Sequence, residues 1–187
     1  MGRIRRRAAG FACCWLVAAA AAAQPGFAKP ALITSAGQSA DAAIVKLAAN
    51  TQYGVGLEYN PSALPRDLDG VRSVVLVVGT TPEGLASAGT DLPGEIERTK
   101  ALLAAARANG LSILAVHTGG RARRDKASNQ LIELVVPQAD YVVVVAAGNA
   151  DKLFQKLAAA RNTPVVQVDR VPAVGGALSA VFNRSQG

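Results

Sequence analysis

The sequence predicts an α/β fold: a three-layer, doubly wound, mostly parallel sheet of about five or six strands, flavodoxin-like or Rossmann-like, in a single domain. Two observations predict it. From Ala31 onward, short runs rich in Val, Leu and Ile alternate with helical patterns, which is typical of βαβ units. The run at 71–78 is apolar at nearly every position, as expected for a strand that is buried on both faces of a parallel sheet.

The first half of the predicted domain begins with a strand at 31–34. Ser39 is expected to cap a helix that ends near Asn50. A weaker strand follows at 55–59, and the loop after it is expected to hold one helical turn around Asp67. The strongest strand precedes a stretch, 79–94, rich in Gly, Ser and Thr. We predict a loop there, and loops of that length are usually functional or disordered.

The second half repeats the alternation. Pro93 and Glu95 near the start and Gly110 after the end indicate a helix between them. Asn149 is expected to cap a later helix. The predicted helices cover 95–109, 128–136, 150–161 and 176–182, and the predicted strands cover 111–116, 141–145 and 164–168.

The first 28 residues have the pattern of a secretory signal. Four arginines are followed by an apolar run at 8–23, and small residues at Gly26 and Ala28 fit cleavage before Lys29. Cleavage after Ala23 is the alternative. The run is too short and too rich in Ala to serve as a stable membrane anchor. The sequence therefore predicts export to the periplasm or secretion, with residues 29–187 as a single α/β domain.

Removing these 28 of the 187 residues leaves 159, enough for one domain with a substantial core. Four of the 20 basic residues leave with the signal, so 16 remain against 13 acidic residues, a net charge of +3. The basic residues are not interleaved with aromatic ones, so no nucleic-acid partner is expected. Oligomeric state is left open by the sequence.

The composition gives little support to metals or cofactors. Both cysteines, Cys13 and Cys14, lie in the signal, so the mature domain is expected to have no thiol ligand. One histidine and no local carboxylate cluster make a poor metal site. The loops lack both nucleotide-binding motifs and the aromatic residues that a flavin prefers. We therefore expect neither a metal nor a cofactor.

Polar loops follow three of the predicted strands, at the sheet edge where ligands bind in open α/β folds. The first contains Ser35, Gly37, Gln38 and Ser39 at a helix start, which suits a phosphate or carboxylate; the alternative is an ordinary serine cap. The second is the Gly-rich loop, whose backbone N–H groups can approach a ligand closely. The alternative there is a lid or a disordered segment.

The third loop is the turn 117–124, which carries three arginines. Arginine recognises carboxylate and phosphate with two parallel hydrogen bonds. The alternatives are a solvated charge run and, for His117, a structural hydrogen bond. The predicted catalytic residue is His117, and the predicted ligand-binding residues are Ser35, Gly37, Gln38, Ser39, Gly79, Gly84, Gly89, His117, Gly119, Gly120, Arg123, Arg124 and Asn149.

Three segments together resemble the uncharacterised bacterial domain-of-unknown-function family 6305: residues 32–41, residues 77–89 and the turn 117–124. In that family an acidic residue usually stands at the position of Arg121, so the resemblance favours Arg123 and Arg124 as site residues. It implies a small exported α/β protein and supplies no activity.

The leading functional expectation is an exported, periplasmic binding protein for a small anionic ligand, held by helix N-termini, the Gly/Ser/Thr loop and arginine side chains. The first alternative is a hydrolase or transferase that uses His117 as acid or base. A further alternative is a structural or partner-binding domain without a small-molecule ligand.

Overall fold

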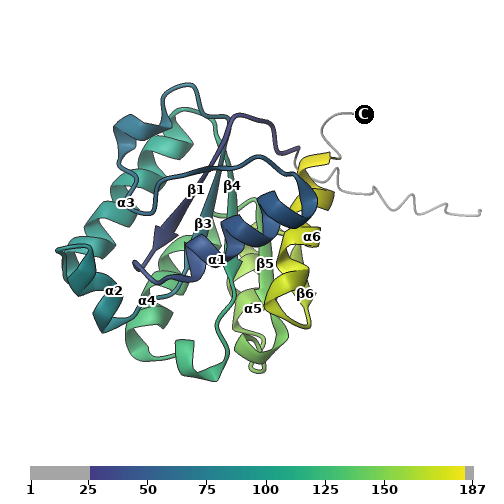
Figure 1. Ribbon diagram of the computed structural model, residues 1–187. Coiled ribbons are helices and arrows are strands. Elements are labelled where there is room, and N and C mark those ends of the chain that lie inside the picture. Colours follow the sequence, from purple (N-terminus) through teal and green to yellow (C-terminus); the bar gives the residue numbers. More distant parts are fainter. Residues whose placement is uncertain (1–25, 184–187) are drawn as a thin grey trace, which may run out of the picture.

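The computed structural model describes residues 26–183, and the predicted signal therefore lies outside the described residues except for 26–28. Six strands form one parallel sheet in the order β2-β1-β3-β4-β5-β6 (Figure 1). This confirms the predicted fold class. The strands are β1 (Ala31–Ala36), β2 (Glu58–Tyr59), β3 (Ser73–Val78), β4 (Ser112–His117), β5 (Tyr141–Val145) and β6 (Val165–Val168).

Helices cover both faces of this sheet (Figure 1). Helices α1 and α6 pack on one face, and α3, α4 and α5 pack on the other. The helices are α1 (Asp41–Leu47), α2 (Pro82–Ser87), α3 (Leu92–Ala108), α4 (Lys126–Val135), α5 (Leu153–Ala158) and α6 (Val171–Asn183). Shorter turns are η1 (Ala48–Gln52), η2 (Pro65–Leu68), η3 (Arg121–Arg123), η4 (Val136–Gln138), η5 (Ala146–Gly148) and η6 (Ala159–Arg161).

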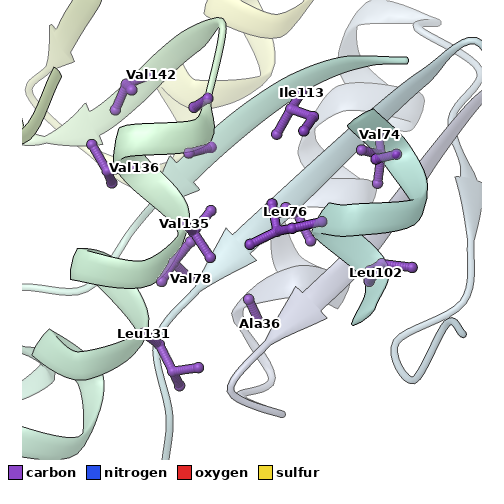
Figure 2. Packing of buried hydrophobic residues seen from close by; sticks show 14 of the residues in the cluster. Ala36, Val74, Leu76, Val78, Leu102, Ile113, Leu131, Val135, Val136 and Val142 are labelled. Carbon is purple, nitrogen blue, oxygen red and sulfur yellow. The ribbon is translucent and has the colours of Figure 1, made fainter. Parts of the chain in front are cut away.

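The two hydrophobic cores follow from the alternation of side chains along each strand. In β3, Val74, Leu76 and Val78 point to the α3–α4–α5 face, where Figure 2 shows them beside residues such as Leu102 and Leu131. The intervening residues of β3 point to the α1–α6 face. All six residues of β3 are buried, which is why the sequence there shows an unbroken apolar run and no alternation.

The stretch predicted as a long loop, 79–94, contains a helix. Thr81 begins α2 as its N-cap, accepting a hydrogen bond from the Gly84 N–H at 3.0 Å, and Pro82 occupies the first helical turn. Asp91 then caps α3 in the same way, accepting from Gly94 N–H at 2.8 Å. A chain segment capped at both helix starts has little backbone left to act as a lid.

Four other helices begin at residues different from those expected. The helix after β1 starts at Asp41, and Ser39 does not cap it. Asp125 caps α4, so that helix starts at Lys126. Helix α5 starts only at Leu153, and α6 starts already at Val171 because a proline at its second residue is compatible with the first turn.

The strand order fixes where the loops meet. From β1 the chain proceeds to β2 on one side of the sheet, whereas β3 lies on its other side. The loops after β1 and β3 therefore diverge at a topological switch point, the position at which open α/β sheets bind ligands. Among the residues that the structure describes, no helix is both long and apolar enough to cross a bilayer.

Candidate functional site

The loops that follow β1, β3 and β4 meet around Gly79. A Cβ atom built on Gly79 would lie 3.8 Å from Asp41 Oδ2, 3.9 Å from Ser39 Oγ and 4.0 Å from His117 Nδ1. The structure thus brings together three of the predicted site residues, Ser39, Gly79 and His117, and adds Asp41. Gly37 explains how the loops come so close, because a side chain there would stand 2.3 Å from the Gly79 carbonyl oxygen.

The loop after β1 is held by a buried carboxylate from α3. The Gly37 N–H donates to Glu95 Oε1 at 2.7 Å, and the Gln38 side-chain amide donates to Oε2 at 3.1 Å. The Glu95 side chain is completely buried. We expected the N–H groups of this loop to be free for a ligand anion. The Gly37 N–H instead donates to a carboxylate of the protein itself.

Arg98 neutralises this carboxylate from one turn further along α3. Its Nη2 and Nε donate to the two Glu95 oxygens at 2.6 and 2.8 Å. The remaining guanidinium donors reach the backbone carbonyls of Ser35 and Ala63. The ion pair thus ties α3 to the end of β1 and to the segment after β2, and Ser35 and Gly37 have structural roles in it.

Three side-chain oxygens near Gly79 are buried without a hydrogen-bond partner among the described residues: Ser39 Oγ, Asp41 Oδ2 and Thr80 Oγ1. We call Ser39, Asp41 and Thr80 the orphan cluster. The residues are 5, 9 and 3 % exposed, respectively. A buried polar atom without a partner is costly, and a carboxylate oxygen is costlier than a hydroxyl. The carboxylate oxygen of Asp41 can only accept, whereas the two hydroxyls can donate as well as accept.

His117 ends β4 and is fully buried. Its Nδ1 lies 2.8 Å from the Val78 carbonyl oxygen, so this nitrogen must carry the proton that is donated. The ring packs on Phe154 with centroids 5.2 Å apart, and Gly148 covers its other nitrogen so closely that a Cβ there would lie 2.9 Å from Nε2. Burial lowers the pKa of His117, which favours the neutral imidazole.

In the arginine turn, Arg124 and Arg123 differ in whether their guanidinium groups have hydrogen-bond partners. Arg124 donates to Asn129 Oδ1 and to both carboxylate oxygens of Asp151, at 3.1 and 2.9 Å, and it also bonds the Gly148 carbonyl. Its guanidinium lies 5.6 Å from the centre of the Phe154 ring. The pair lowers the pKa of Asp151, chiefly through the hydrogen bonds from Arg124.

Arg123 differs from Arg124. Its Nη1 is buried and has no partner among the described residues. Its stem covers Gly119 so tightly that a Cβ on that glycine would stand 2.2 Å from Arg123 Cβ. Gly120, by contrast, faces only Ala147, at an ordinary 3.7 Å. Gly119 is therefore needed for the path of the turn, and Arg123 carries a cationic nitrogen without an assigned partner.

The other predicted residues have mixed surroundings. Asn149 is buried and donates to Gln155 and Gln167 at 2.9 and 3.1 Å, while its oxygen accepts from the Phe154 N–H. Gly84 packs directly against the Gln38 carbonyl oxygen. Gly89 ends α2 with a φ of +64° and faces open space. Asn149 and Gly84 therefore hold the loops in place, and Gly89 is a helix stop.

Two cavities lie at this edge of the sheet. The β1 cleft, of about 460 Å³, is lined by the loop after β1, the segment after β2 and helix α2, and Ser39 and Gln38 are part of its wall. The arginine cavity, of about 240 Å³, lies between the turn after β4 and the turn after β5. It is lined by Arg121, Arg124, Asn129, Ala147, Gly148, Ala150 and Asp151. The two cavities share no lining residue.

Several residues of this edge were not predicted. Asp41 stands two positions after Ser39 in the same loop, and this proximity is the signal that could have identified it. Glu95 and Arg98 were visible as an i,i+3 pair of opposite charge. Nothing in the sequence linked them to Gly37, which is 58 positions from Glu95. Over the described residues, no group of three or more His, Cys, Asp or Glu residues comes together as a metal site would require.

Comparison with known proteins gives one family. The model of a domain of unknown function, DUF6305, matches residues 28–182. The matched region contains the orphan cluster, the Glu95–Arg98 pair and the whole arginine turn. No curated protein matches the chain.

Proposed function

The chain belongs to the DUF6305 family, and from this premise we propose that it is an exported binding protein for a small anionic ligand. The proposed site is the arginine cavity together with Arg123. Export is inferred from the basic and apolar pattern of residues 1–28.

One observation carries the proposal: the buried Arg123 Nη1 has no partner among the described residues. A guanidinium remains charged under all conditions in which a protein is folded. Burying part of it without an acceptor is unfavourable unless an anion or water supplies one. A carboxylate or phosphate oxygen is the acceptor that a guanidinium prefers.

The arginine cavity beside Arg123 supports the same class of ligand. Arg124 already holds a carboxylate, that of Asp151, in a two-pronged arrangement. The Asp151 side chain is 57 % exposed and lines the cavity, so the carboxylate that Arg124 already holds is open to solvent. Arg121 lines the same cavity and is exposed. A ligand anion in this cavity would therefore meet Arg121 and compete with Asp151 for Arg124, and Arg123 lies between these two arginines in the same turn.

The surroundings of His117 favour binding over acid–base catalysis. Its Nδ1 is engaged by Val78, and its Nε2 is buried beneath Gly148. A general acid or base must come within hydrogen-bond reach of the substrate proton. The observed contacts suit a residue that fixes the end of β4 next to the arginine turn.

The experiment is isothermal titration of the purified protein with inorganic phosphate, sulfate and succinate. Arg123→Gln and Arg121→Gln remove one positive charge each at the proposed site. Arg66→Gln is the matched control, because its side chain is 80 % exposed and lines neither cavity. We expect one of the probes to bind, with a loss of about tenfold or more in Arg123→Gln and no change in Arg66→Gln.

A thermal or urea measurement gives a second readout. At about 100 times its dissociation constant, a bound anion stabilises the folded state by about 2.7 kcal/mol. Arg123→Gln should lose most of that gain. Absence of binding by all three probes, or equal affinity in Arg123→Gln and Arg66→Gln, would contradict the proposal.

A further inference from the structure

The arginine cavity is lined by charges of both signs. Arg121 and Arg124 are its cations, and the carboxylate of Asp151 is its anion. Lys152, the neighbour of Asp151 in the sequence, does not line it. The rest of the wall is uncharged and consists of Asn129, Ala147, Gly148 and Ala150. A ligand in this cavity therefore meets a negative group as well as positive ones.

The two lining arginines differ in how far the protein already neutralises them. Arg124 donates to both oxygens of Asp151, at 3.1 and 2.9 Å, so its charge is compensated from within the chain. Arg121 is exposed and forms no ion pair within 4 Å in the described part of the chain. Arg121 is therefore the cation that a ligand anion can reach without displacing a group of the protein.

The Asp151 carboxylate can accept a further hydrogen bond. Its Oδ1 accepts from Arg124 and, at 3.2 Å, from the Leu153 N–H. Its Oδ2 accepts from Arg124 alone among the described residues, although a carboxylate oxygen has room for two donors. The hydrogen bonds from Arg124 hold the pKa of Asp151 below its usual range, so the group is charged at neutral pH. A charged carboxylate can only accept, whereas a hydroxyl can also donate.

A ligand that is purely anionic binds next to this carboxylate at a cost. The cavity has a volume of only about 240 Å³, so an anion at Arg121 cannot lie far from Asp151. Like charges that are close together repel, and more strongly as water is excluded. The anion must tolerate that repulsion or displace Asp151 from Arg124. A positive group on the same ligand, placed beside Asp151, would turn the repulsion into attraction and leave the ion pair intact.

We propose that the anion bound in the arginine cavity also carries an ammonium group, so that the ligand is a small amino dicarboxylate. This inference rests on the function proposed above. The cavity is lined by two cations and one anion, and the complementary pattern is two carboxylates and one ammonium group. An ammonium group has three donors and no acceptor, which suits Asp151 Oδ2. The volume is below the range of about 300–1,000 Å³ found for drug-sized ligands, which restricts the ligand to a compact one.

The competing occupant is a plain dicarboxylate, which has no positive group. It carries one more net negative charge than an amino dicarboxylate. Attraction to the arginines alone would therefore favour the plain dicarboxylate. Attraction to Asp151 favours the amino dicarboxylate. The two possibilities predict opposite orders of affinity, and the charge of Asp151 decides between them.

The test is isothermal titration of the full chain with L-aspartate, L-malate and succinate. The three probes share one carbon chain and two carboxylates, and differ in having an ammonium group, a hydroxyl or a hydrogen at one carbon. Asp151→Asn removes the negative charge of the cavity with little change in shape. Asp69→Asn is the matched control, because Asp69 is exposed and does not line the cavity. Thermal melts of each variant establish that it is folded.

We expect L-aspartate to bind about fivefold more tightly than L-malate or succinate, the upper end for an ion pair open to solvent. In Asp151→Asn the affinity for L-aspartate should fall by up to about fivefold, while the affinities for L-malate and succinate rise. Arg121→Gln should weaken the binding of all three probes, and Asp69→Asn should change none. If Asp151→Asn does not fold, the order of the three affinities in the unsubstituted protein decides.

Two results would overturn this inference: L-malate or succinate binding at least as tightly as L-aspartate, or an affinity for L-aspartate that does not fall in Asp151→Asn. The function proposed above would survive either of them, provided that succinate binding is lost in Arg123→Gln. Binding of none of the probes, or equal affinities for all of them in Arg121→Gln, Arg123→Gln and the unsubstituted protein, would overturn both.

Discussion

The ring of Phe27 packs edge-on against the ring of Phe182, with centroids 6.0 Å apart and an interplanar angle of 64°. The Phe27 ring also packs edge-on against the ring of Tyr141 in β5, with centroids 6.2 Å apart. Phe27 is fully buried, and Ser112 Oγ donates to the neighbouring Gly26 carbonyl at 3.1 Å. Gly26 and Phe27 are therefore packed as part of the folded domain, although the predicted cleavage before Lys29 would place them outside it.

This contact predicts where an exported chain is cut. Cleavage after Ala28 would remove Phe27 from the core, whereas the alternative cleavage after Ala23 keeps it. We expect the mature protein to begin at Gln24, as read by mass spectrometry of protein recovered from the periplasm or medium of a native host. A mature N-terminus at Lys29 would contradict this, and an intact Met1 on a cytosolic protein would contradict export itself.

The same contact has a measurable energy. Phe27→Ala should lower the free energy of unfolding by about 3–5 kcal/mol, because it empties a buried aromatic site. Leu47→Ala is the control, since Leu47 is 60 % exposed and should cost far less. Urea unfolding followed by circular dichroism measures both. Equal costs in the two variants would mean that the segment before β1 does not pack as described.

Two ion pairs on α3 provide a matched comparison of burial. Glu95–Arg98 and Glu97–Lys100 have the same i,i+3 spacing, but Glu95 is fully buried and Glu97 is 71 % exposed. Glu95→Gln should cost about 3–5 kcal/mol, since it leaves Arg98 buried without its counter-charge. Glu97→Gln should cost about 1 kcal/mol or less. Chemical denaturation of both variants checks this, and similar small losses would show that Glu95 does not hold the loop after β1.

The chain has a single histidine, so the protonation of His117 can be followed by NMR without overlap. Burial lowers its pKa, so we expect a midpoint below the ordinary value of about 6.5. As the pH falls below that value, the unfolded chain binds a proton that the folded chain does not. The contribution of His117 to the free energy of unfolding should therefore be constant above about pH 6.5. It should decline from there down to the pKa of the folded histidine, by at most about 1.4 kcal/mol per pH unit.

His117→Gln is the control for that pH dependence. Whatever its overall stability, its free energy of unfolding should lose the slope between about pH 6.5 and the pKa of the folded histidine. A titration midpoint at or above the ordinary value, with an unchanged slope in the variant, would show that the imidazole is accessible. That result would reopen the catalytic alternative.

Asp151 competes with any ligand anion for Arg124, so removing its charge should strengthen anion binding. We expect Asp151→Asn to raise the affinity for whichever of phosphate, sulfate or succinate binds, by up to about tenfold. Asp69→Asn, at an exposed loop position that lines neither cavity, should leave it unchanged. Isothermal titration checks both, and weaker binding in Asp151→Asn would place the anion elsewhere.

Much of the fold could be predicted because the central strands are uniformly apolar. The run that became β3 needed no structure to identify it, and the turn around Asp67 was anticipated as well. Helix α2 was missed because a six-residue segment with a glycine inside it has weak local helix signals. Its cap, Thr81 followed by Pro82, was present in the sequence but looked like loop chemistry.

The site was predicted at the level of loops and not of atoms. Sequence reasoning placed Ser39, Gly79 and His117 at one edge, and the structure brings them together. It could not tell which polar groups are already satisfied from within the protein. Glu95 fills the hydrogen bond of Gly37, and Asp151 occupies Arg124, and both partners are distant in sequence. Such occupancy depends on tertiary contacts that no local pattern encodes.

The grip of Glu95 on the loop after β1 bears on how fast that edge can respond. Gly37 and Gln38 are fixed from α3 before any ligand arrives, so the adjoining wall of the β1 cleft is already in its final shape. Association with a rigid wall loses little conformational entropy. Its observed rate should rise linearly with ligand concentration, without a plateau set by an opening step. Differences in affinity between ligands would then come mainly from their dissociation rates, and therefore from how long each ligand stays bound.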